Sequence, residues 1–187
     1  MSDENVLLLV RPTRLNTTRQ HRALYEQIFV RLPGLVRALS LLRLGLPMRS
    51  RLRRFLLLRF AELASVAANR QDFDLLFTGF DPQLDLRTAA GVYPTELSGR
   101  HAGHSGYRDL WGKLLEVWED VRIEPEELID TGDCIISLTR VDTRGAGSGV
   151  PVSLKMFQVF RFRAGLVVRQ DDVQDYAEAL AAAGLSE

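Results

Sequence analysis

The amino-acid sequence predicts an α+β fold: a curved, cone-shaped, mixed but mostly antiparallel sheet packed on three helices, with an extra helical arm at the N-terminus. Three observations lead to this prediction. Apolar residues recur at helical spacing up to about residue 120. Beyond it they alternate with the period of two that is typical of strands, in four consecutive segments. The connections between these segments are short, which favours antiparallel pairing of neighbouring strands.

The N-terminal segment, residues 1–49, differs from the rest of the chain in charge. Residues 1–60 contain twelve arginines and three acidic residues, although the whole chain has 24 basic and 24 acidic side chains. Arginines also interrupt the apolar tract 28–46, and a helix that spans a bilayer needs about 20 nearly uncharged residues. We expect a basic, partly helical arm that packs against its own domain or a second subunit. Docking to a membrane is a less favoured alternative, and docking to a partner protein would need an apolar groove lined by Leu39, Leu42 and Leu46.

The second unit, residues 50–187, begins after Pro47–Met48 with segments of helical spacing. Ser50 is the expected N-cap of a first helix. Its buried stripe comprises Leu52, Phe55, Leu56, Phe60, Leu63, Ala64 and Ala67. Asp72 can cap a second, short helix that Gly79 ends, and a short strand follows at 84–88. Residues 89–106 are rich in glycine, which predicts a loop at the rim of a pocket. A third helix, 106–120, follows this loop.

Four strands are predicted at 121–130, 133–144, 151–163 and 166–173, followed by a helix over 175–183 that ends at Gly184. Apolar side chains occupy both alternating sets of positions along 151–163. Only one set can face the helices, so the other face of the sheet needs cover. We expect a second subunit to provide it and the protein to be a homodimer, with the arm as the alternative cover.

Composition excludes several classes of protein. Basic and acidic residues balance, so no overall charge attracts the chain to nucleic acid. A single cysteine, Cys134, cannot form an internal disulfide, which favours a cytoplasmic location. His101 and His104 form an isolated pair without a third ligand at a motif spacing, and the glycine-rich run 145–149 precedes a strand instead of a helix. We therefore expect no metal and no cofactor.

Four short stretches, in this order, carry a resemblance to a known family. They are Asn69-Arg-Gln-Asp-Phe-Asp, Phe80-Asp-Pro-Gln-Leu-Asp, Gly103-His-Ser-Gly-Tyr-Arg-Asp-Leu-Trp and Phe160-Arg-Phe-Arg-Ala-Gly-Leu-Val. Together they resemble the nuclear transport factor 2-like superfamily in its SnoaL-like branch, over about residues 52–173. The superfamily includes ketosteroid isomerases, polyketide cyclases, limonene epoxide hydrolases and binding modules without catalysis, so the resemblance implies a cone-shaped fold but no single function.

The chain lacks the isomerase residues that the resemblance would require. Ala64 stands where those enzymes have a tyrosine, Gln158 where they have a donor acid, and the position of the base falls near Arg87 or Thr88. The epoxide hydrolase pattern matches better. In that pattern Asp142 and Asp172 would be the catalytic acid and base, and the guanidinium of Arg140 would bind both carboxylates. The residues that position water in those enzymes are replaced here by Asp85 and Arg87, and the same three residues can equally form a solvated surface ion pair.

The sequence therefore predicts an apolar pocket that binds a hydrophobic small molecule. The alternative is an epoxide-hydrolase-, cyclase- or isomerase-like enzyme that acts on a hydrophobic, oxygenated substrate through Arg140, Asp142 and Asp172. The expected pocket residues are Phe60, Ala64, Leu84, Leu86, Trp111, Ile136, Leu138, Leu154, Met156 and Gln158, with Asp85 and His104 at the mouth. This set follows from the inward helical stripe and from assigning Ile136, Leu138 and Gln158 to the pocket side of the sheet.

Overall fold

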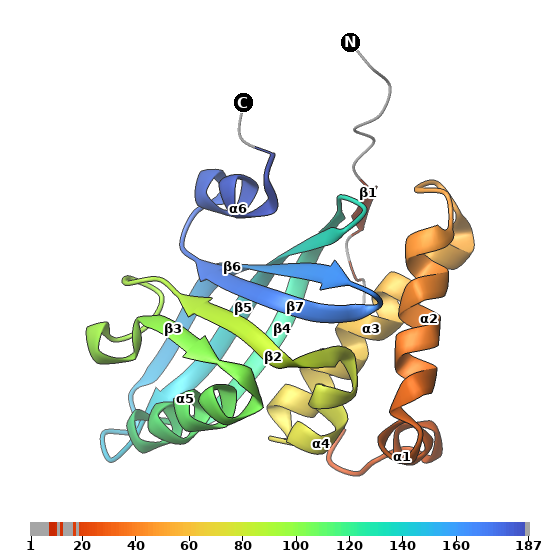
Figure 1. Cartoon of the computed structure of the whole chain (residues 1–187). Helices are drawn as coiled ribbons and strands as arrows, with labels where there is room; N and C mark the ends of the chain where they lie inside the picture. Colours follow the sequence, from red (N-terminus) through yellow and green to blue (C-terminus); the bar gives the residue numbers. More distant parts are fainter. Residues whose placement is uncertain (1–7, 11, 13–16, 18, 186–187) are drawn as a thin grey trace.

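The computed structural model describes residues 8–10, 12, 17 and 19–185, and its centre is a strongly curled sheet of seven strands (Figure 1). The strands are β1 (Leu8–Val10), β2 (Phe80–Thr88), β3 (Gly99–Ala102), β4 (Trp118–Asp130), β5 (Cys134–Gly145), β6 (Pro151–Arg163) and β7 (Leu166–Val173). Their order is β1-β4-β5-β6-β7-β2-β3. Strands β2 and β7 pair in parallel and the other neighbours pair antiparallel. The predicted α+β class with a mixed, mostly antiparallel sheet is confirmed.

Three helices and a 3₁₀ turn lie against the inner face of the sheet (Figure 1): α3 (Arg51–Asn69), α4 (Phe73–Leu76), η1 (Phe77–Gly79) and α5 (Gly103–Val117). The predicted caps are present, because the Ser50 side chain accepts a hydrogen bond from the backbone N of Arg53 and Asp72 accepts one from Leu75. Helix α5 packs with β2 in the main core, where Leu110 and Trp111 share a cluster with Leu84 and Leu86. This end of the cone is filled by side chains.

Residues 89–106 correct one prediction. They contain the 3₁₀ turn η2 (Thr95–Leu97) and the strand β3, which pairs with β2 from Asp85 to Thr88, and α5 already begins at Gly103. The strand Gly-Arg-His-Ala has no apolar alternation, so hydrophobic periodicity could not reveal it. Strand β1 was also not predicted; it pairs with the end of β4, with Leu8 opposite Asp130.

The described part of the arm forms two helices, α1 (Leu24–Arg31) and α2 (Pro33–Gly45), which contact their own domain at α3, α4 and η1. The β6–β7 turn also approaches α2 closely. Arg37 Nε donates to the carbonyl of Ala164 at 2.8 Å. Gly165 has φ +82°, and a Cβ there would lie 2.8 Å from the Arg37 carbonyl oxygen, so only glycine fits the contact. The arm helices are thus built into the fold.

The outer face of the sheet is covered in part by the last helix, α6 (Tyr176–Ala183), which begins after the cap Asp175 and ends at Gly184 in the left-handed conformation. Ala179 and Ala183 of α6 pack on Cys134, Ile136 and Val159. Burial raises the pKa of the Cys134 thiol to about 11, which fits an unreactive core residue.

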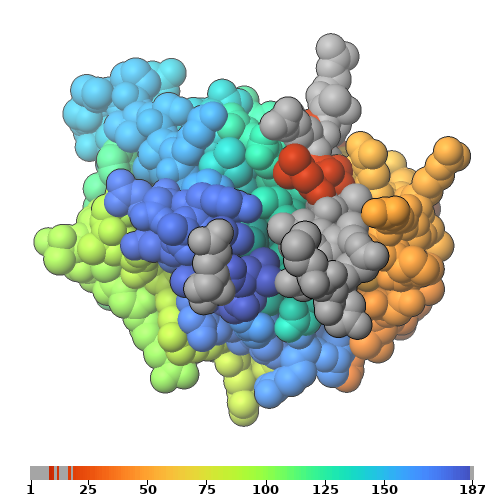
Figure 2. All heavy atoms as spheres, turned by 90° about the horizontal axis from the view of Figure 1, so that it is seen from above, coloured from red at the N-terminus to blue at the C-terminus, as the bar shows by residue number. Residues whose placement is uncertain are grey.

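Helix α6 therefore covers part of the outer face, and the arm does not cover it; cover of the rest by a second subunit stays a prediction. The arm lies elsewhere: in the view from above, its orange residues form one side of the molecule, away from the blue C-terminal helix α6 (Figure 2). Phe157 is half-buried on this face against Tyr176, with ring centroids 5.7 Å apart.

Among the described helices, none is long and apolar enough to cross a membrane.

Candidate functional site

A cavity of about 110 Å³ lies inside the wide end of the cone, between α3 and the inner face of the sheet. Small residues on one side of α3 create it. Ala61, Ala64, Ser65 and Ala68 recur at positions i, i+3, i+4 and i+7, and all four line the cavity. Their short side chains leave space that the facing strands do not fill. The larger apolar lining residues include Leu57, Phe60, Leu63, Leu76, Phe80 and Phe160.

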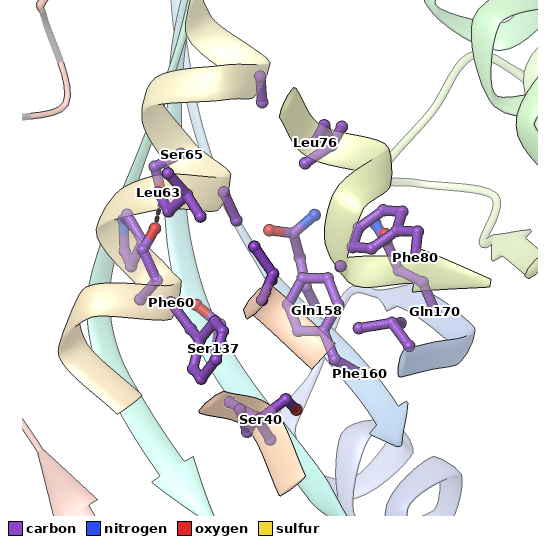
Figure 3. A pocket seen from close by; sticks show the side chains of 18 of the residues that line it. Ser40, Phe60, Leu63, Ser65, Leu76, Phe80, Ser137, Gln158, Phe160 and Gln170 are labelled. Carbon is purple, nitrogen blue, oxygen red and sulfur yellow. Dashed lines mark hydrogen bonds between the residues drawn. The ribbon is translucent and has the colours of Figure 1, made fainter. Parts of the chain in front are cut away.

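Two of the polar lining residues are glutamines, and both are hydrogen-bonded to a buried carboxyl group. Gln158 of β6 and Gln170 of β7 line the cavity, and their Nε2 atoms donate to Oδ1 of Asp172 at 3.3 and 2.9 Å. The hydroxyl of Tyr93 donates to the other oxygen, Oδ2, at 2.6 Å. Oε1 of Gln158 accepts from Thr139 at 3.2 Å. Asp172 thus lies behind the amides and fixes their orientation (Figure 3 shows Gln158 and Gln170 in the wall).

Burial raises the pKa of Asp172, although the hydrogen bonds from Tyr93, Gln170 and Gln158 act in the opposite direction. Burial also raises the pKa of Tyr93, and the neighbouring carboxylate adds to the effect. The carboxyl group therefore holds its proton to a higher pH than an exposed aspartate. A buried carboxyl of this kind next to a cavity is a candidate proton donor or acceptor.

Only some of the predicted pocket residues line the cavity. Phe60, Ala64 and Gln158 do. The prediction is wrong for three residues that are buried in the core between β2 and α5 and do not line the cavity: Leu84, Leu86 and Trp111. The reason is that α5 fills that end of the cone. Leu154 and Met156 lie on the same face as Gln158, but they pair with Val141 and Thr139 farther along the β5–β6 hairpin, beyond the cavity lining.

Strand β5 is turned over relative to the prediction. Ile135 and Ser137 line the cavity, whereas Ile136 packs under α6 on the outer face. Leu138, two residues after Ile136, lies on the same outer face and does not line the cavity. The prediction failed because it placed the apolar residues inside, and here the outer face is the more apolar one, since α6 covers it.

The three predicted catalytic residues do not converge. Arg140 follows Ile136 and Leu138 on the outer face, where it contacts Glu124 and, at 3.6 Å, both Glu126 and Asp142. Its side chain is 39% exposed. On β6, Arg140 pairs with Lys155 and Asp172 pairs with Gln158. Lys155 and Gln158 are three residues apart and therefore point to opposite faces of the sheet, so Arg140 and Asp172 do too. Arg140 thus contacts Asp142 as expected, but the expected contact with Asp172 is wrong.

The two residues expected at the mouth have other partners. Asp85 is half-buried on β2, where it pairs with Arg87 and Arg100. The His104 ring stacks on Phe77 with centroids 3.9 Å apart, and its Nε2 lies 3.3 Å from the carbonyl oxygen of Phe80. Across the described residues, no group of three or more His, Cys, Asp or Glu side chains is placed to hold a metal ion.

Sequence reasoning missed Tyr93, Gln170 and Ser137 as site residues. Gln170 could have been found, because it shares strand parity with Asp172 and is a polar residue on an inward-facing set of positions. Tyr93 offered no such signal. It lies in the segment between β2 and β3, and only tertiary structure brings its hydroxyl to Asp172.

A comparison of the sequence with models of known families gives a match. The model of the SnoaL-like domain family matches residues 59–170, more than half of the chain, and this range includes the second half of α3 and both glutamines. The chain belongs to the SnoaL-like family. The predicted relationship to the nuclear transport factor 2-like superfamily is thereby confirmed. A comparison with curated proteins gave no match.

Solved structures support the same fold for this SnoaL-like chain. A nuclear transport factor 2-like protein of unknown function from Burkholderia pseudomallei is 24% identical, covers 66% of this chain and 93% of its own, and gives a TM-score of 0.57. TerC, co-crystallised with polyporic acid, is 20% identical, with 68% and 95% coverage and a TM-score of 0.57. A ketosteroid isomerase-like protein from Catenulispora acidiphila, in complex with trimethylamine, is 16% identical, with 67% and 92% coverage and a TM-score of 0.54.

Proposed function

We propose that this SnoaL-like chain binds a small hydrophobic molecule inside the cone. One observation carries the proposal: the cavity beside α3 is lined mainly by apolar side chains and has its amides gathered at one place, Gln158 and Gln170. An apolar cavity with a few convergent polar groups is the usual form of a small-molecule site. Two proteins of the same fold were crystallised with organic molecules, polyporic acid and trimethylamine, and the proposal extends this class of ligand to the present chain.

The cavity also limits the ligand. Its volume of about 110 Å³ is slightly below the ~150 Å³ of an engineered apolar cavity that binds benzene, so a single ring or a short chain is the appropriate size. Oε1 of Gln170 is buried and has no hydrogen-bond partner among the described residues. Because a buried acceptor without a partner is costly, a ligand hydroxyl or N–H that donates to this oxygen is favoured.

The test is a titration with benzyl alcohol, followed by amide NMR shifts. Ala64 lines the cavity from α3, so Ala64→Leu should fill the space and weaken binding at least tenfold while the chain stays folded. Ala38→Leu is the matched control, because Ala38 is exposed on α2 and should leave binding unchanged. Equal binding by the wild type and Ala64→Leu, or no binding by the wild type, would contradict the proposal.

A second candidate is an enzyme that acts on a hydrophobic, oxygenated substrate. Of the three residues first considered, only Asp172 lies near the cavity, and its buried carboxyl group with the raised pKa supports acid–base chemistry. The carboxyl group would give a proton to the substrate or take one from it, Tyr93 would hold the carboxyl group in place through their 2.6 Å hydrogen bond, and the amides of Gln158 and Gln170 would orient the substrate oxygen.

This candidate is tested with a panel of single-ring epoxides and enones. Asp172→Asn should abolish turnover without changing the fold. Asp142→Asn is the control, because Asp142 lies on the outer face and should retain full turnover. Loss of turnover in both variants, or in neither, would reject Asp172 as the acid–base group, and absence of any product with the wild type would leave binding as the function.

A further inference from the structure

A buried cluster with excess positive charge lies at the α2 end of the cavity. The carboxylate of Asp130, at the end of β4, accepts hydrogen bonds from Arg43 of α2 and Arg53 of α3. The exposed fractions of the three side chains are 0% for Arg43, 3% for Arg53 and 0% for Asp130. Two guanidinium groups thus share one carboxylate away from water. Such a charge excess is costly unless a further anion balances it.

The hydrogen bonds of the two arginines differ. Arg53 places Nε and Nη2 on the two oxygens of Asp130, at 2.8 and 2.9 Å, and its Nη1 donates to the Leu46 carbonyl at 2.7 Å. Arg43 reaches Asp130 with Nη1 alone, at 2.9 Å. Its Nε and Nη2 are buried and have no hydrogen-bond partner among the described residues. Burial lowers the pKa of Arg43 in spite of Asp130, which agrees with an incompletely balanced charge.

The unpaired edge of Arg43 has a defined chemical preference. Nε and Nη2 together form the side of a guanidinium that holds a carboxylate through two parallel hydrogen bonds. This chain uses the same edge elsewhere: Arg53 on Asp130, Arg169 on Asp171 with both distances 2.7 Å, and Arg22 on Asp72. Arg43 therefore presents a carboxylate-binding edge that no described side chain occupies.

Arg43 is not itself a lining residue, but its neighbours place it beside the cavity. Ser40 lines the cavity one helical turn before Arg43 on the same side of α2, and its Oγ is also buried without a partner among the described residues. The Arg43 guanidinium lies over the ring of Phe162, 4.7 Å from its centroid, and Phe162 lines the cavity. Ile135, the cross-strand partner of Asp130, lines it as well. Figure 3 shows Ser40 at the end of the pocket that is farthest from Leu76.

We propose that the ligand of this cavity is a small apolar carboxylic acid, whose carboxylate binds Ser40 Oγ and the Nε–Nη2 edge of Arg43. The inference rests on the proposed binding function and specifies its ligand class. The apolar body of the acid occupies the cavity along α3, and a donor at its far end pairs with Oε1 of Gln170. The carboxylate brings the second negative charge that the two arginines lack.

The experiment compares benzoate with benzyl alcohol, a neutral molecule of similar size, by calorimetry at pH 7 and by NMR of the arginine Nε–H groups. The wild type should bind benzoate at least tenfold more tightly, and benzoate should shift the Arg43 Nε–H signal. Ser40→Ala should weaken benzoate binding several-fold, and Arg43→Lys, which keeps the charge but loses the edge, should remove the preference for benzoate. Arg31→Lys, an exposed position on α1, is the control that should change nothing.

Each other result decides against the inference in a distinct way. If benzyl alcohol binds as tightly as benzoate, the carboxylate inference fails and the proposed function stands. If neither binds, both fail. If sodium acetate or chloride shifts the Arg43 signal as strongly as benzoate at equal concentration, the edge is a site for free anions that is independent of the cavity. If Arg43→Lys does not fold, the Ser40→Ala variant and the Arg43 signal of the wild type still decide.

Discussion

Asp130→Asn is the substitution that most directly tests how the N-terminal helices are held. It preserves the shape of the side chain and removes its charge. In the wild type this carboxylate accepts from Arg43 and Arg53 and from the backbone N of Gly132 at 3.0 Å. The variant leaves two buried guanidinium groups without a counterion. The NH₂ group of the new asparagine would also face N–H groups that donate to the carboxylate in the wild type.

The expected loss of stability follows from burial. Removal of one partner from a buried ion pair costs about 3–5 kcal/mol, because the remaining charge stays desolvated. Two cations are left here, so we expect a value in the upper half of that range. Asp85→Asn is a matched control, since Asp85 also pairs with two arginines. Those arginines are 48% and 69% exposed, and we expect a loss of less than about 1 kcal/mol.

Urea unfolding followed by circular dichroism measures both variants. Burial alone would raise the pKa of Asp130, but hydrogen bonds and charges from Arg53 and Arg43 outweigh it, so the pKa is lowered on folding. The contribution of Asp130 is therefore complete at neutral pH and disappears as the pH falls below about 4 through the folded-state pKa. The difference between wild type and Asp130→Asn should shrink over this interval. An Asp130→Asn variant that is no less stable than Asp85→Asn would refute the reasoning.

Two further predictions concern the site and the assembly. Burial raises the pKa of Asp172, so the wild type should be most stable relative to Asp172→Asn at about pH 4. This advantage should be lost as the pH rises through the folded-state pKa of Asp172. If the stabilities of the two proteins change in parallel from pH 4 to 8, the prediction is wrong. The outer face of the sheet beyond α6 should pair with a second copy, so light scattering should give twice 21.1 kDa for the wild type and the monomer mass for Leu138→Asp. A wild-type monomer at micromolar concentration would reject the dimer.

The strands β6 and β7 show where sequence was sufficient. Both were predicted with the observed bounds, 151–163 and 166–173, because turn residues separate them: the glycine-rich run 145–149 precedes β6, and Ala164–Gly165 joins it to β7. The four-residue β3 was missed because it is held by pairing with β2, a tertiary effect that leaves no apolar pattern in the sequence. Short edge strands of this kind depend on their neighbours more than on their own residues.

The site was harder to predict than the fold because its strand positions reverse the usual pattern. Around the cavity the inner face of β5 carries Ser137 and Thr139, while its outer face carries Ile136 beneath α6. The rule that apolar residues point inward therefore assigned Ile136 and Leu138 to the pocket side. Arg140 and Asp142 share their face and were assigned to the same wrong side. Asp172 was chosen on its position near the end of β7, and its true partners, Tyr93 and two glutamines, follow from the folding of the intervening chain.

The way in which α2 is anchored has a consequence for biosynthesis. Arg37 contacts Ala164, which lies 127 positions later in the chain, and Arg43 contacts Asp130, which lies 87 positions later. At a translation rate of about 5–20 residues per second, roughly 6–25 s separate the synthesis of Arg37 from that of its partner. During this time α2 can pack on α3 and η1, but Arg37 and Arg43 lack these later partners. The anchoring of α2 can therefore be completed only after the β6–β7 turn has been synthesised.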